Sequence, residues 1–586
     1  MRAAGLAVVA AAGLAAALAP GGCGRGPRPS VLLITIDTLR ADAVSAWGRE
    51  SGTTPRLDAL AASGLRFDAA TTVTPLTLPA HASLLTGWRP ARVGLTVNGL
   101  GRPALPVATL AERLARAGYA TAAFVSSAVL DRRHGLDAGF QRYDDELAQP
   151  GGPAVALERP ADATVDRALA WDGWGRESFF AWVHLFDPHA PYAAPGGREG
   201  QDRAAYLDEV RFADAQVGRL LDEVGRRASG PVLVVVTSDH GEGLGEHGEE
   251  THGLLLNEST LHVPLIVGWL STPEGAWPPA AAVRHDAVSV LDVTPTLLEL
   301  IGLPAVADAD GASLMSARPG RALPLETRAP WFYYGFSSLA GVRRDALKLV
   351  GAPAAADPAW TLVDLATDPR EEAGQVVAAH QLVALVRTPD PEAEGALVGD
   401  PVSLVALGYV GATAPAPSSA PCPDPRGQME LIVALDRANT ALALGDSAGA
   451  LRDLDALDPR WERAPERLYL RGRALAALDR LEEAAQAFEL ACGLRPTAEL
   501  LTERGLVLLR LADRGGDTID AAIQSLDRAL VLAPDDPRAI SLRARADLSA
   551  GRFDDAQRRI DEALADRPRD AYLVAAQRDI LKARDR

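Results

Sequence analysis

Residues 73–87 carry a hydroxyl group at a place where it could act as a nucleophile. The segment passes from polar to apolar residues, with Thr77 at the transition. Pro79 suits the first turn of a helix, because a missing N–H costs nothing there, and residues 80–85 continue as helix formers. Thr77 would then lie beside the unpaired amides and the positive end of the helix, which stabilise an alkoxide and an incoming oxyanion. The competing interpretation is an ordinary cap, since threonine is a common N-cap residue.

Two short apolar runs, residues 31–36 and 232–237, lead into acidic residues. Asp37 follows the first run, and Asp239 and His240 come soon after the second. Continuous runs of β-branched and Leu residues indicate buried strands of a parallel sheet, whose carboxyl ends bind ligands in open α/β folds. The three side chains should therefore meet at one edge of the sheet. Taken singly, each Asp is more often a strand-end or helix-cap residue.

Two carboxylates and an imidazole gathered around a threonine suit a single divalent cation. Such a cation neutralises a substrate oxyanion and favours the threonine alkoxide. On ligand type alone Ca, Mg, Mn and Zn fit about equally well, so the identity of the metal stays open. The chemistry expected of this set is attack on an anionic ester.

Strand and helix patterns alternate along the first part of the chain, as a doubly wound sheet requires. Residues 109–118 have the pattern of an amphipathic helix, residues 119–125 that of a strand, and residues 179–186 form another strand-like run. The predicted fold class is therefore α/β. Three later segments separated by Gly, Pro and Asp turns predict the strands of a small antiparallel subdomain: residues 331–336, 347–350 and 360–365.

Several motifs occur in a fixed order along residues 30–388. They are Asp37-Thr-Leu-Arg-Ala-Asp42, Thr54-Pro-Arg-Leu-Asp-Ala-Leu-Ala-Ala-Ser-Gly64, Thr77-Leu-Pro-Ala-His-Ala-Ser-Leu-Leu-Thr-Gly87, Asp187-Pro-His-Ala-Pro-Tyr192, Ser238-Asp-His-Gly-Glu242 with Gly245-Glu-His-Gly248, and Val290-Leu-Asp-Val-Thr-Pro-Thr-Leu-Leu298. In this order the set resembles the sulfatase family of the alkaline phosphatase superfamily. The resemblance implies an alkaline-phosphatase-like sheet domain that ends in a small antiparallel subdomain, a bound divalent metal and an anionic ester substrate.

The chain departs from this family at its most important motif. Sulfatases carry Cys or Ser followed by x-Pro-x-Arg, and that Cys or Ser becomes formylglycine. Here Thr77 takes the place of the nucleophile and His81 that of the Arg, so formylglycine cannot form. The usual Asp-Asp pair is Asp37-Thr38, which leaves Thr38 at a metal-binding position without a carboxylate.

Other positively charged side chains that a sulfate-binding site of this family carries are also missing. The family's Gly-Lys-x-His segment aligns with residues 124–127, and a later active-site Lys aligns with His252. By resemblance, His189 is a substrate-contacting histidine that could protonate the leaving oxygen, with His252 beside it. His184 is better explained as a packed strand histidine, because His is moderately often buried. The role of His247, in a Gly-rich loop, stays open.

A threonine nucleophile beside Asp, Asp and His ligands resembles the phosphodiesterase and phospholipid head-group transferase branches of the superfamily. In those branches the Thr attacks phosphorus and is transiently phosphorylated. An unactivated hydroxyl needs a metal and a helix end to become a good nucleophile, and covalent catalysis divides the displacement into two steps. We therefore expect hydrolysis of phosphoric diesters ahead of sulfuric esters. Head-group transfer and a catalytically inactive binding protein are the alternatives.

The net charge of −18 over 586 residues argues against nucleic acid as a partner, because its phosphates would be repelled. An anionic substrate must then be attracted by the local metal ion. The length predicts more than one domain, and a hydrophobic fraction of 48% is ample for sizeable cores.

The amino terminus has the pattern of an export signal. Met1-Arg2 precedes an Ala/Leu/Val run, so residues 1–23 are predicted to be a secretory signal. The run ends in Ala19-Pro-Gly-Gly-Cys23, which resembles a bacterial lipoprotein box, and Cys23 is a candidate lipid anchor. We expect an exported protein that is periplasmic or a membrane-anchored lipoprotein. The alternatives are a cleaved soluble signal and a lone anchor, although the run is shorter than the roughly 20 residues that a bilayer needs.

Residues 389–428 are rich in Pro, Ala, Gly and Ser, which predicts a linker. Residues 429–586 then change to Ala/Leu/Arg/Glu helices with prolines 37, 38 and 34 residues apart, from Pro459 to Pro568. This resembles the tetratricopeptide repeat, an all-α array that stacks helix pairs. A plain helical bundle is the alternative. We expect three or four repeats that bind a protein partner or the catalytic domain, with small first-turn residues at Ala450, Ala484, Ala522 and Ala556.

Overall fold

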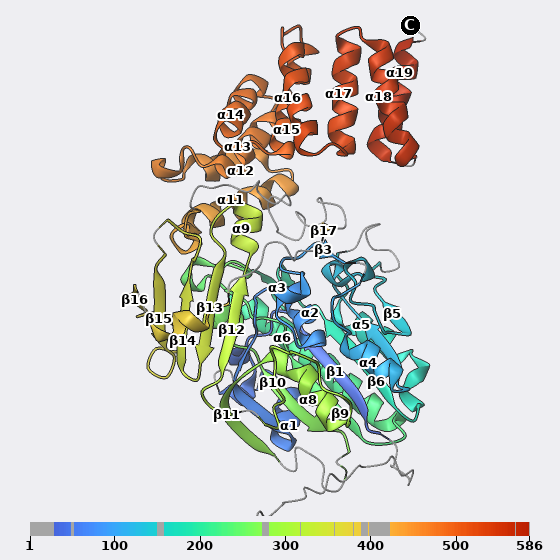
Figure 1. Cartoon of the computed structure of the whole chain (residues 1–586), viewed down its shortest axis with the longest axis vertical. Coiled ribbons are helices and arrows are strands. Elements are labelled where there is room, and N and C mark those ends of the chain that lie inside the picture. Colours follow the sequence, from blue (N-terminus) through green and yellow to red (C-terminus); the bar gives the residue numbers. More distant parts are fainter. Residues whose placement is uncertain are drawn as a thin grey trace, which may run out of the picture.

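The structure is a computed structural model with an α/β body and, above it in Figure 1, a region of paired helices. Cys23 and the rest of the predicted signal lie outside the described residues, as does most of the predicted linker. Among the helices described, none is both long enough and apolar enough to span a bilayer. The described residues are 28–48, 52–102, 104–148, 157–271, 273, 281–316, 318–356, 358–378, 380–387, 396–397, 422–568 and 570–584.

An eight-stranded sheet forms the centre of the α/β body. Strand β1 (Ser30–Ile36) lies between β6 (Phe179–Leu185) and β9 (Val232–Thr237) and is parallel to both. These runs are buried along their whole length, because helices cover both faces of the sheet. The remaining strands are β2 (Leu65–Thr71), β4 (Ala120–Phe124), β5 (Arg142–Asp144), β10 (Leu265–Trp269) and β11 (Ala282–Ser289), in the order β11-β2-β10-β9-β1-β6-β4-β5.

The sheet is mixed, because β10 runs antiparallel to both of its neighbours. Alternate residues of β1 enter different cores: Leu33 faces one layer of helices, and Leu32 and Ile34 face the other. This confirms the predicted doubly wound α/β class. The first layer holds α2 (Thr77–Thr86), α4 (Leu110–Arg116) and α8 (Val293–Leu300), and the second holds α1 (Pro55–Ser63), α5 (Ala161–Leu169) and α6 (Arg203–Arg227).

A second, antiparallel sheet follows the first and matches the predicted subdomain. The predicted strands at residues 347–350 and 360–365 are present as β14 and β15. The sheet contains β12 (Ala322–Thr327), β13 (Leu339–Arg344), β14 (Leu347–Gly351), β15 (Trp360–Asp364) and β16 (Gln375–Val377), each paired with the next.

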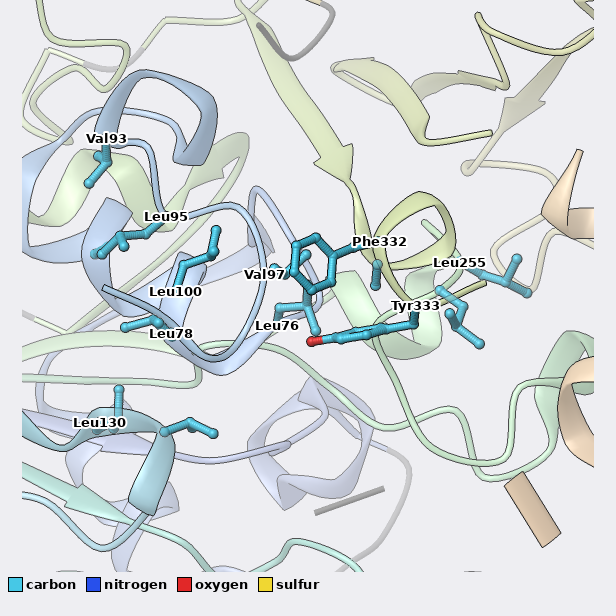
Figure 2. Close-up of a cluster of buried hydrophobic side chains, with 14 of the residues drawn as sticks. Leu76, Leu78, Val93, Leu95, Val97, Leu100, Leu130, Leu255, Phe332 and Tyr333 are labelled. Atoms are coloured by element: carbon cyan, nitrogen blue, oxygen red, sulfur yellow. The ribbon is translucent and has the colours of Figure 1, made fainter. Parts of the chain in front are cut away.

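The strand predicted over residues 331–336 is wrong, because this segment forms helix α9 (Ala329–Tyr334). Pro330 supplies the preset φ that favours a first helical turn, and Gly335 ends the helix in a left-handed conformation with φ 71°. Aromatic residues favour strands on average. Here Phe332 and Tyr333 are packed in a cluster of buried hydrophobic side chains while the segment is helical (Figure 2). Burial on a helical face therefore outweighed the local propensity.

The C-terminal helices form four consecutive pairs and a final helix within the part of the chain that is described. Ala450, Ala484, Ala522 and Ala556 are each the fourth residue of the second helix of a pair, and all are fully buried. Small side chains there let the helices of a pair approach closely. The helices are α11 (Met429–Ala443), α12 (Ser447–Asp455), α13 (Pro465–Ala477), α14 (Leu481–Leu494), α15 (Ala498–Ala512), α16 (Ile519–Leu532), α17 (Pro537–Ser549), α18 (Phe553–Asp566) and α19 (Ala571–Arg584).

Helix α11 docks these pairs, which we call the repeat region, on the α/β body. Leu431, Ile432 and Leu435 of α11 belong to the same buried cluster as the first helical layer of the sheet. The Tyr334 hydroxyl donates a 2.7 Å hydrogen bond to Asp436, and Arg437 pairs with Glu250. Apolar burial provides most of the attachment, and these polar contacts fix its orientation.

Candidate active site

The central side chains of the site lie at or near the carboxyl ends of three strands, at one edge of the large sheet. Asp37 directly follows β1, Asp239 and His240 follow β9, and His184 is the next-to-last residue of β6. All four side chains are buried. Since β1 lies between β6 and β9, the parallel arrangement brings these positions together, as strand order and direction dictate.

The predicted metal-binding residues lie close enough to share one ion. Asp37, Asp239 and His240 each offer a ligand atom, and these atoms lie within 4.8 Å of one another. His240 Nε2 is 3.4 Å from Asp239 Oδ2 and 3.7 Å from Asp37 Oδ1. Its Nδ1 lies 3.0 Å from the Gly241 carbonyl, which accepts the ring hydrogen and leaves the Nε2 lone pair facing the carboxylates.

The cluster contains polar atoms that the described part of the chain does not satisfy. Both oxygens of Asp37, Asp239 Oδ2 and His184 Nε2 are buried there without a hydrogen-bond partner. Burial raises the pKa of Asp37 well above its ordinary value of 3.8, and the nearby Asp239 adds to the rise. Buried unpaired carboxylates cost free energy, and a divalent cation removes that cost. The residues present therefore fit a metal ion.

Thr77 lies at the first position of α2, with its hydroxyl in this cluster. Its Oγ1 is 3.1 Å from His240 Nε2, while Leu76 occupies the N-cap position. The alternative of an ordinary threonine cap is therefore wrong. The expectation of open helix amides needs a correction too, because the Leu78 amide donates to Asn98 Oδ1 and Pro79 has no N–H. Activation of Thr77 depends on the cluster more than on the amides of the first turn.

His81 supports Thr77 from within α2. The Trp182 indole donates to Thr35 Oγ1, and the Thr35 hydroxyl then donates to His81 Nε2, both at 2.9 Å. The ring hydrogen is thereby placed on Nδ1, which donates to the Thr77 carbonyl at 2.8 Å. Burial lowers the pKa of His81 to about 3, so the ring is neutral and does not supply the positive charge of an Arg.

Thr38, predicted at a metal-binding position, has another partner. Its hydroxyl donates to the carbonyl of Pro188, and its backbone has φ 54° in the left-handed region. The Tyr206 hydroxyl binds the Thr38 carbonyl at 2.9 Å. These bonds fasten the turn after β1 to the segment that carries His189. The hydroxyl hydrogen of Thr38 is thus used by a backbone carbonyl.

His252 and His189 form a second group beside the cluster. The His252 ring lies 4.3 Å from that of His240 and 5.1 Å from that of His189, between ring centroids. His252 Nδ1 lies 3.1 Å from Glu242 Oε1, and the Tyr192 hydroxyl donates to the other oxygen of this carboxylate. Burial lowers the pKa of His252 well below 6.5, so Nδ1–H donates to Glu242 and Nε2 stays available for a proton.

His189 is arranged differently from His252. Its Nδ1 donates to the neighbouring Ala190 carbonyl at 2.7 Å, and its ring stacks on Phe186 with centroids 4.3 Å apart. Burial lowers the pKa of His189 to about 4, and the adjacent His252 contributes. Both rings are neutral, but a protonated His252 would be stabilised by its contact with Glu242, whereas the described hydrogen bond of His189 goes to a backbone carbonyl. His247 lies apart, 3.0 Å from the Arg370 carbonyl.

Sequence reasoning missed Glu242 and misjudged His184. Glu242 belongs to the quoted Ser238–Glu242 motif, so its carboxylate could have been paired with a nearby imidazole. The interpretation of His184 as a packing residue is incomplete, because its Nε2 lies 3.3 Å from Asp37 Oδ2. The signal available in the sequence was its place near the carboxyl end of the strand-like run 179–186. The structure adds that it lies directly opposite Thr35 of β1.

Comparison with known proteins agrees with this architecture. The sulfatase family model matches residues 29–303, and two tetratricopeptide repeat models match residues 435–499 and 517–580. N-acetylgalactosamine-6-sulfatase of Sus scrofa is 29% identical over 392 residues, which cover 57% of this chain and 72% of that protein. Arylsulfatase A of Bos taurus is 30% identical over 351 residues, 49% of this chain and 67% of that protein.

Among solved structures, the phosphonate monoester hydrolase of Agrobacterium radiobacter is similar to this chain. Its TM-score is 0.47 at 22% identity, over 59% of this chain and 91% of that one. The curated relatives are aligned over most of their own length. Residues 29–303, which the family model matches, contain the sheet edge described above. The chain therefore belongs to the sulfatase family and carries a region of tetratricopeptide repeats after its α/β body.

Proposed function

We propose that this protein is a metal-dependent ester hydrolase in which Thr77 is the nucleophile, with phosphoric diesters favoured over sulfuric esters. The observation that carries the proposal is the 3.1 Å approach of Thr77 Oγ1 to His240 Nε2, beside three buried carboxylate oxygens, both of Asp37 and Oδ2 of Asp239, that lack hydrogen-bond partners among the described residues. A hydroxyl at a metal site is suited to in-line displacement at phosphorus. Formylglycine, on which sulfate cleavage in this family depends, cannot arise from Thr77.

Asp37, Asp239 and His240 would hold the cation. The bound ion supplies positive charge that stabilises the alkoxide and the substrate oxyanion. His81 fixes the carbonyl of Thr77, and thereby the first turn of α2, while Leu78 is tied to Asn98. The hydroxyl is therefore held in one position before substrate binds, which reduces the entropic cost of reaching the transition state.

Proton transfer is assigned to His252. As the Thr77 oxygen bonds to phosphorus, its proton passes to His252 Nε2, and the resulting imidazolium is stabilised by Glu242. The bond from phosphorus to the leaving oxygen breaks on the opposite side of phosphorus, the aryl oxygen leaves as the phenolate, and His252 passes its proton to water. Water then attacks the phosphothreonine and gives a proton to His252, and the same proton returns to Thr77 as the phosphate monoester leaves. With an alcohol in place of water, the same steps give head-group transfer.

The test compares an aryl phosphodiester with an aryl sulfate on one preparation, with divalent metal added. We expect turnover of the phosphodiester, poor hydrolysis of the sulfate, and loss of activity in Thr77→Ala. Thr77→Ser is the matched variant, because it keeps the hydroxyl and should retain measurable turnover. A Thr77→Ala protein as active as its parent would remove the mechanism, and preferential sulfate cleavage would reverse the substrate assignment.

Export, lipid attachment at Cys23 and protein binding by the repeats complete the proposal. The support is the basic, apolar amino terminus and the repeat composition of residues 429–586. Labelling cells with a fatty acid should mark the wild-type protein and not Cys23→Ser. Unlabelled wild-type protein in the soluble exported fraction would favour a cleaved signal instead.

A further inference from the structure

His184 has an unexplained nitrogen in the middle of the site. Its Nε2 is fully buried, has no hydrogen-bond partner among the described residues, and lies 3.3 Å from Asp37 Oδ2. Together with His81 and Asp239 it forms a second set of candidate ligand atoms, all within 4.8 Å of one another. The two sets share Asp239, and the 3.3 Å contact of His184 with Asp37 links them a second time.

The contacts of Nδ1, on the other side of the His184 ring, determine its tautomer. Ser126 lies just beyond β4, next to β6, and its hydroxyl donates to the backbone carbonyl of His184 at 2.5 Å. With its hydrogen used in this way, Ser126 Oγ can only accept from His184 Nδ1, which is 3.1 Å away. The Ser126 amide also directs its N–H at Nδ1, over a longer distance of 3.4 Å. The shorter contact with the hydroxyl oxygen favours the tautomer with the hydrogen on Nδ1, which leaves the lone pair of Nε2 on the side of Asp37.

This arrangement is the one that orients metal-bound histidines, in which the remote nitrogen donates to an oxygen and the near nitrogen binds. His240 has the same arrangement, with its Nδ1 directed to the Gly241 carbonyl. His81 differs, because its Nδ1 near Asp239 carries a hydrogen that is donated to the Thr77 carbonyl. Of the three histidines in the two sets of candidate ligands, His184 and His240 thus offer a lone pair to an ion.

Spacing supports a shared ion. With bonds of about 2.1 Å, neighbouring ligands of a tetrahedral or octahedral ion lie roughly 3.0–3.4 Å apart. His184 Nε2 is 3.3 Å from Asp37, and His240 Nε2 is 3.4 Å from Asp239. The two Asp37 oxygens face different rings, Oδ1 toward His240 and Oδ2 toward His184. Each ring therefore lies at coordination spacing from one carboxylate, His184 from Asp37 and His240 from Asp239, and His240 Nε2 is 3.7 Å from Asp37 as well.

We infer that His184, held by Ser126, is a fourth protein ligand of the cation, with Asp37, Asp239 and His240, and that the site prefers Zn²⁺ to Ca²⁺ or Mg²⁺. Two imidazoles and two carboxylates are a common ligand set for zinc, whereas Ca²⁺ and Mg²⁺ favour all-oxygen sets. This inference rests on the proposed metal-dependent function, and it adds a ligand and a metal preference to it.

The test measures metal binding by the full-length protein after removal of metal with a chelator. Zn²⁺, Ca²⁺ and Mg²⁺ are titrated against a chromophoric chelator, and Co²⁺ is used to record a ligand-field spectrum. We expect tight Zn²⁺ binding by the wild type. His184→Gln should weaken Zn²⁺ affinity at least about 100-fold and Ser126→Ala about 10-fold. His134→Gln is the matched control, because that buried ring donates to the Leu100 carbonyl away from the site and should bind like the wild type.

The inference is overturned if folded His184→Gln binds Zn²⁺ as tightly as the wild type and gives the same Co²⁺ spectrum. If His184→Gln does not fold, Ser126→Ala decides on the same titration, because it keeps the ring and removes only its partner. Equal or tighter binding of Ca²⁺ by the wild type would overturn the metal preference. Failure of the proposed function is distinct, since it would show as a wild type that binds metal without hydrolysing either ester.

Discussion

At the scale of single residues, the site separates binding of the ion from handling of the proton. Asp37 and Asp239 have oxygens without hydrogen-bond partners among the described residues, which suits a cation. Glu242 has partners on both oxygens, Tyr192 and His252, which suits a carboxylate that orients an imidazole. The two groups touch where the His240 and His252 rings lie 4.3 Å apart. Substitutions in one group should therefore leave the other intact.

Glu242→Gln should lower kcat for the phosphodiester by roughly 100- to 10,000-fold and leave metal affinity near the wild-type value. The amide cannot stabilise the His252 imidazolium that forms when Thr77 loses its proton. The measurement is steady-state kinetics together with a metal titration. Tyr192→Phe is the matched control, because it removes the second partner of Glu242 but keeps the carboxylate, so its loss should be much smaller. An unchanged kcat in Glu242→Gln would exclude His252 as the proton carrier.

At the scale of elements, α9 and α11 connect the repeat region to the loop that carries His252. Tyr334 of α9 binds Asp436 of α11 through its hydroxyl, and Arg495 donates to the Tyr334 carbonyl at 2.8 Å. A Cβ added to Gly248 would lie 3.3 Å from Met429, so the loop lies against the start of α11. Figure 2 shows Leu255, from the end of the same loop, among the buried side chains near Phe332 and Tyr333.

Asp436→Asn should stabilise the protein at pH 8 and have little effect near pH 4. Burial raises the pKa of Asp436 to about 7 from 3.8, and Glu250 adds to the rise. The folded state therefore holds this proton more tightly than the unfolded state, and that stability is lost as pH rises from about 4 through about 7. Asn keeps an acceptor for Tyr334 and avoids the charge. Thermal midpoints should differ by roughly 2–4 °C at pH 8; equal midpoints there would show that the carboxylate is well solvated.

At the scale of the whole molecule, one buried cluster runs from the large sheet into the first repeats. It contains Leu33 of β1, Leu78 of α2, Leu435 of α11 and Leu470 of α13. The outer repeats have smaller clusters of their own, one around Leu526 and another around Ile560. In an array where each pair contacts only its neighbours, distant pairs contribute little to the sheet edge. The inner and outer repeats should therefore differ in their effect on catalysis.

Deleting residues 517–586 should leave phosphodiester hydrolysis within about twofold of the full chain, whereas deleting residues 429–586 should lower both activity and thermal midpoint. The larger deletion uncovers the apolar surface under α11 and removes Arg437 from Glu250. The measurements are kinetics and thermal unfolding of both truncated proteins. Full activity and an unchanged midpoint after the larger deletion would show that the docked helices do not support the site.

The sequence alone determined which side chains end the central strands, because apolar runs and the polar residues after them are local patterns. Asp37, Asp239, His240 and Thr77 are therefore identifiable as site residues from the sequence alone. The helical repeats can also be predicted from the sequence, because prolines recur at nearly constant intervals between their helices.

Tertiary structure decided what a local pattern cannot express. Whether His184 packs or points its lone pair at Asp37 depends on Ser126, 58 residues away, and residues 329–334 became a helix because a distant apolar cluster accepted their aromatic rings. Periodicity reports which residues can be buried, but the partner that a buried polar atom meets is set only when the strands take their order in the sheet.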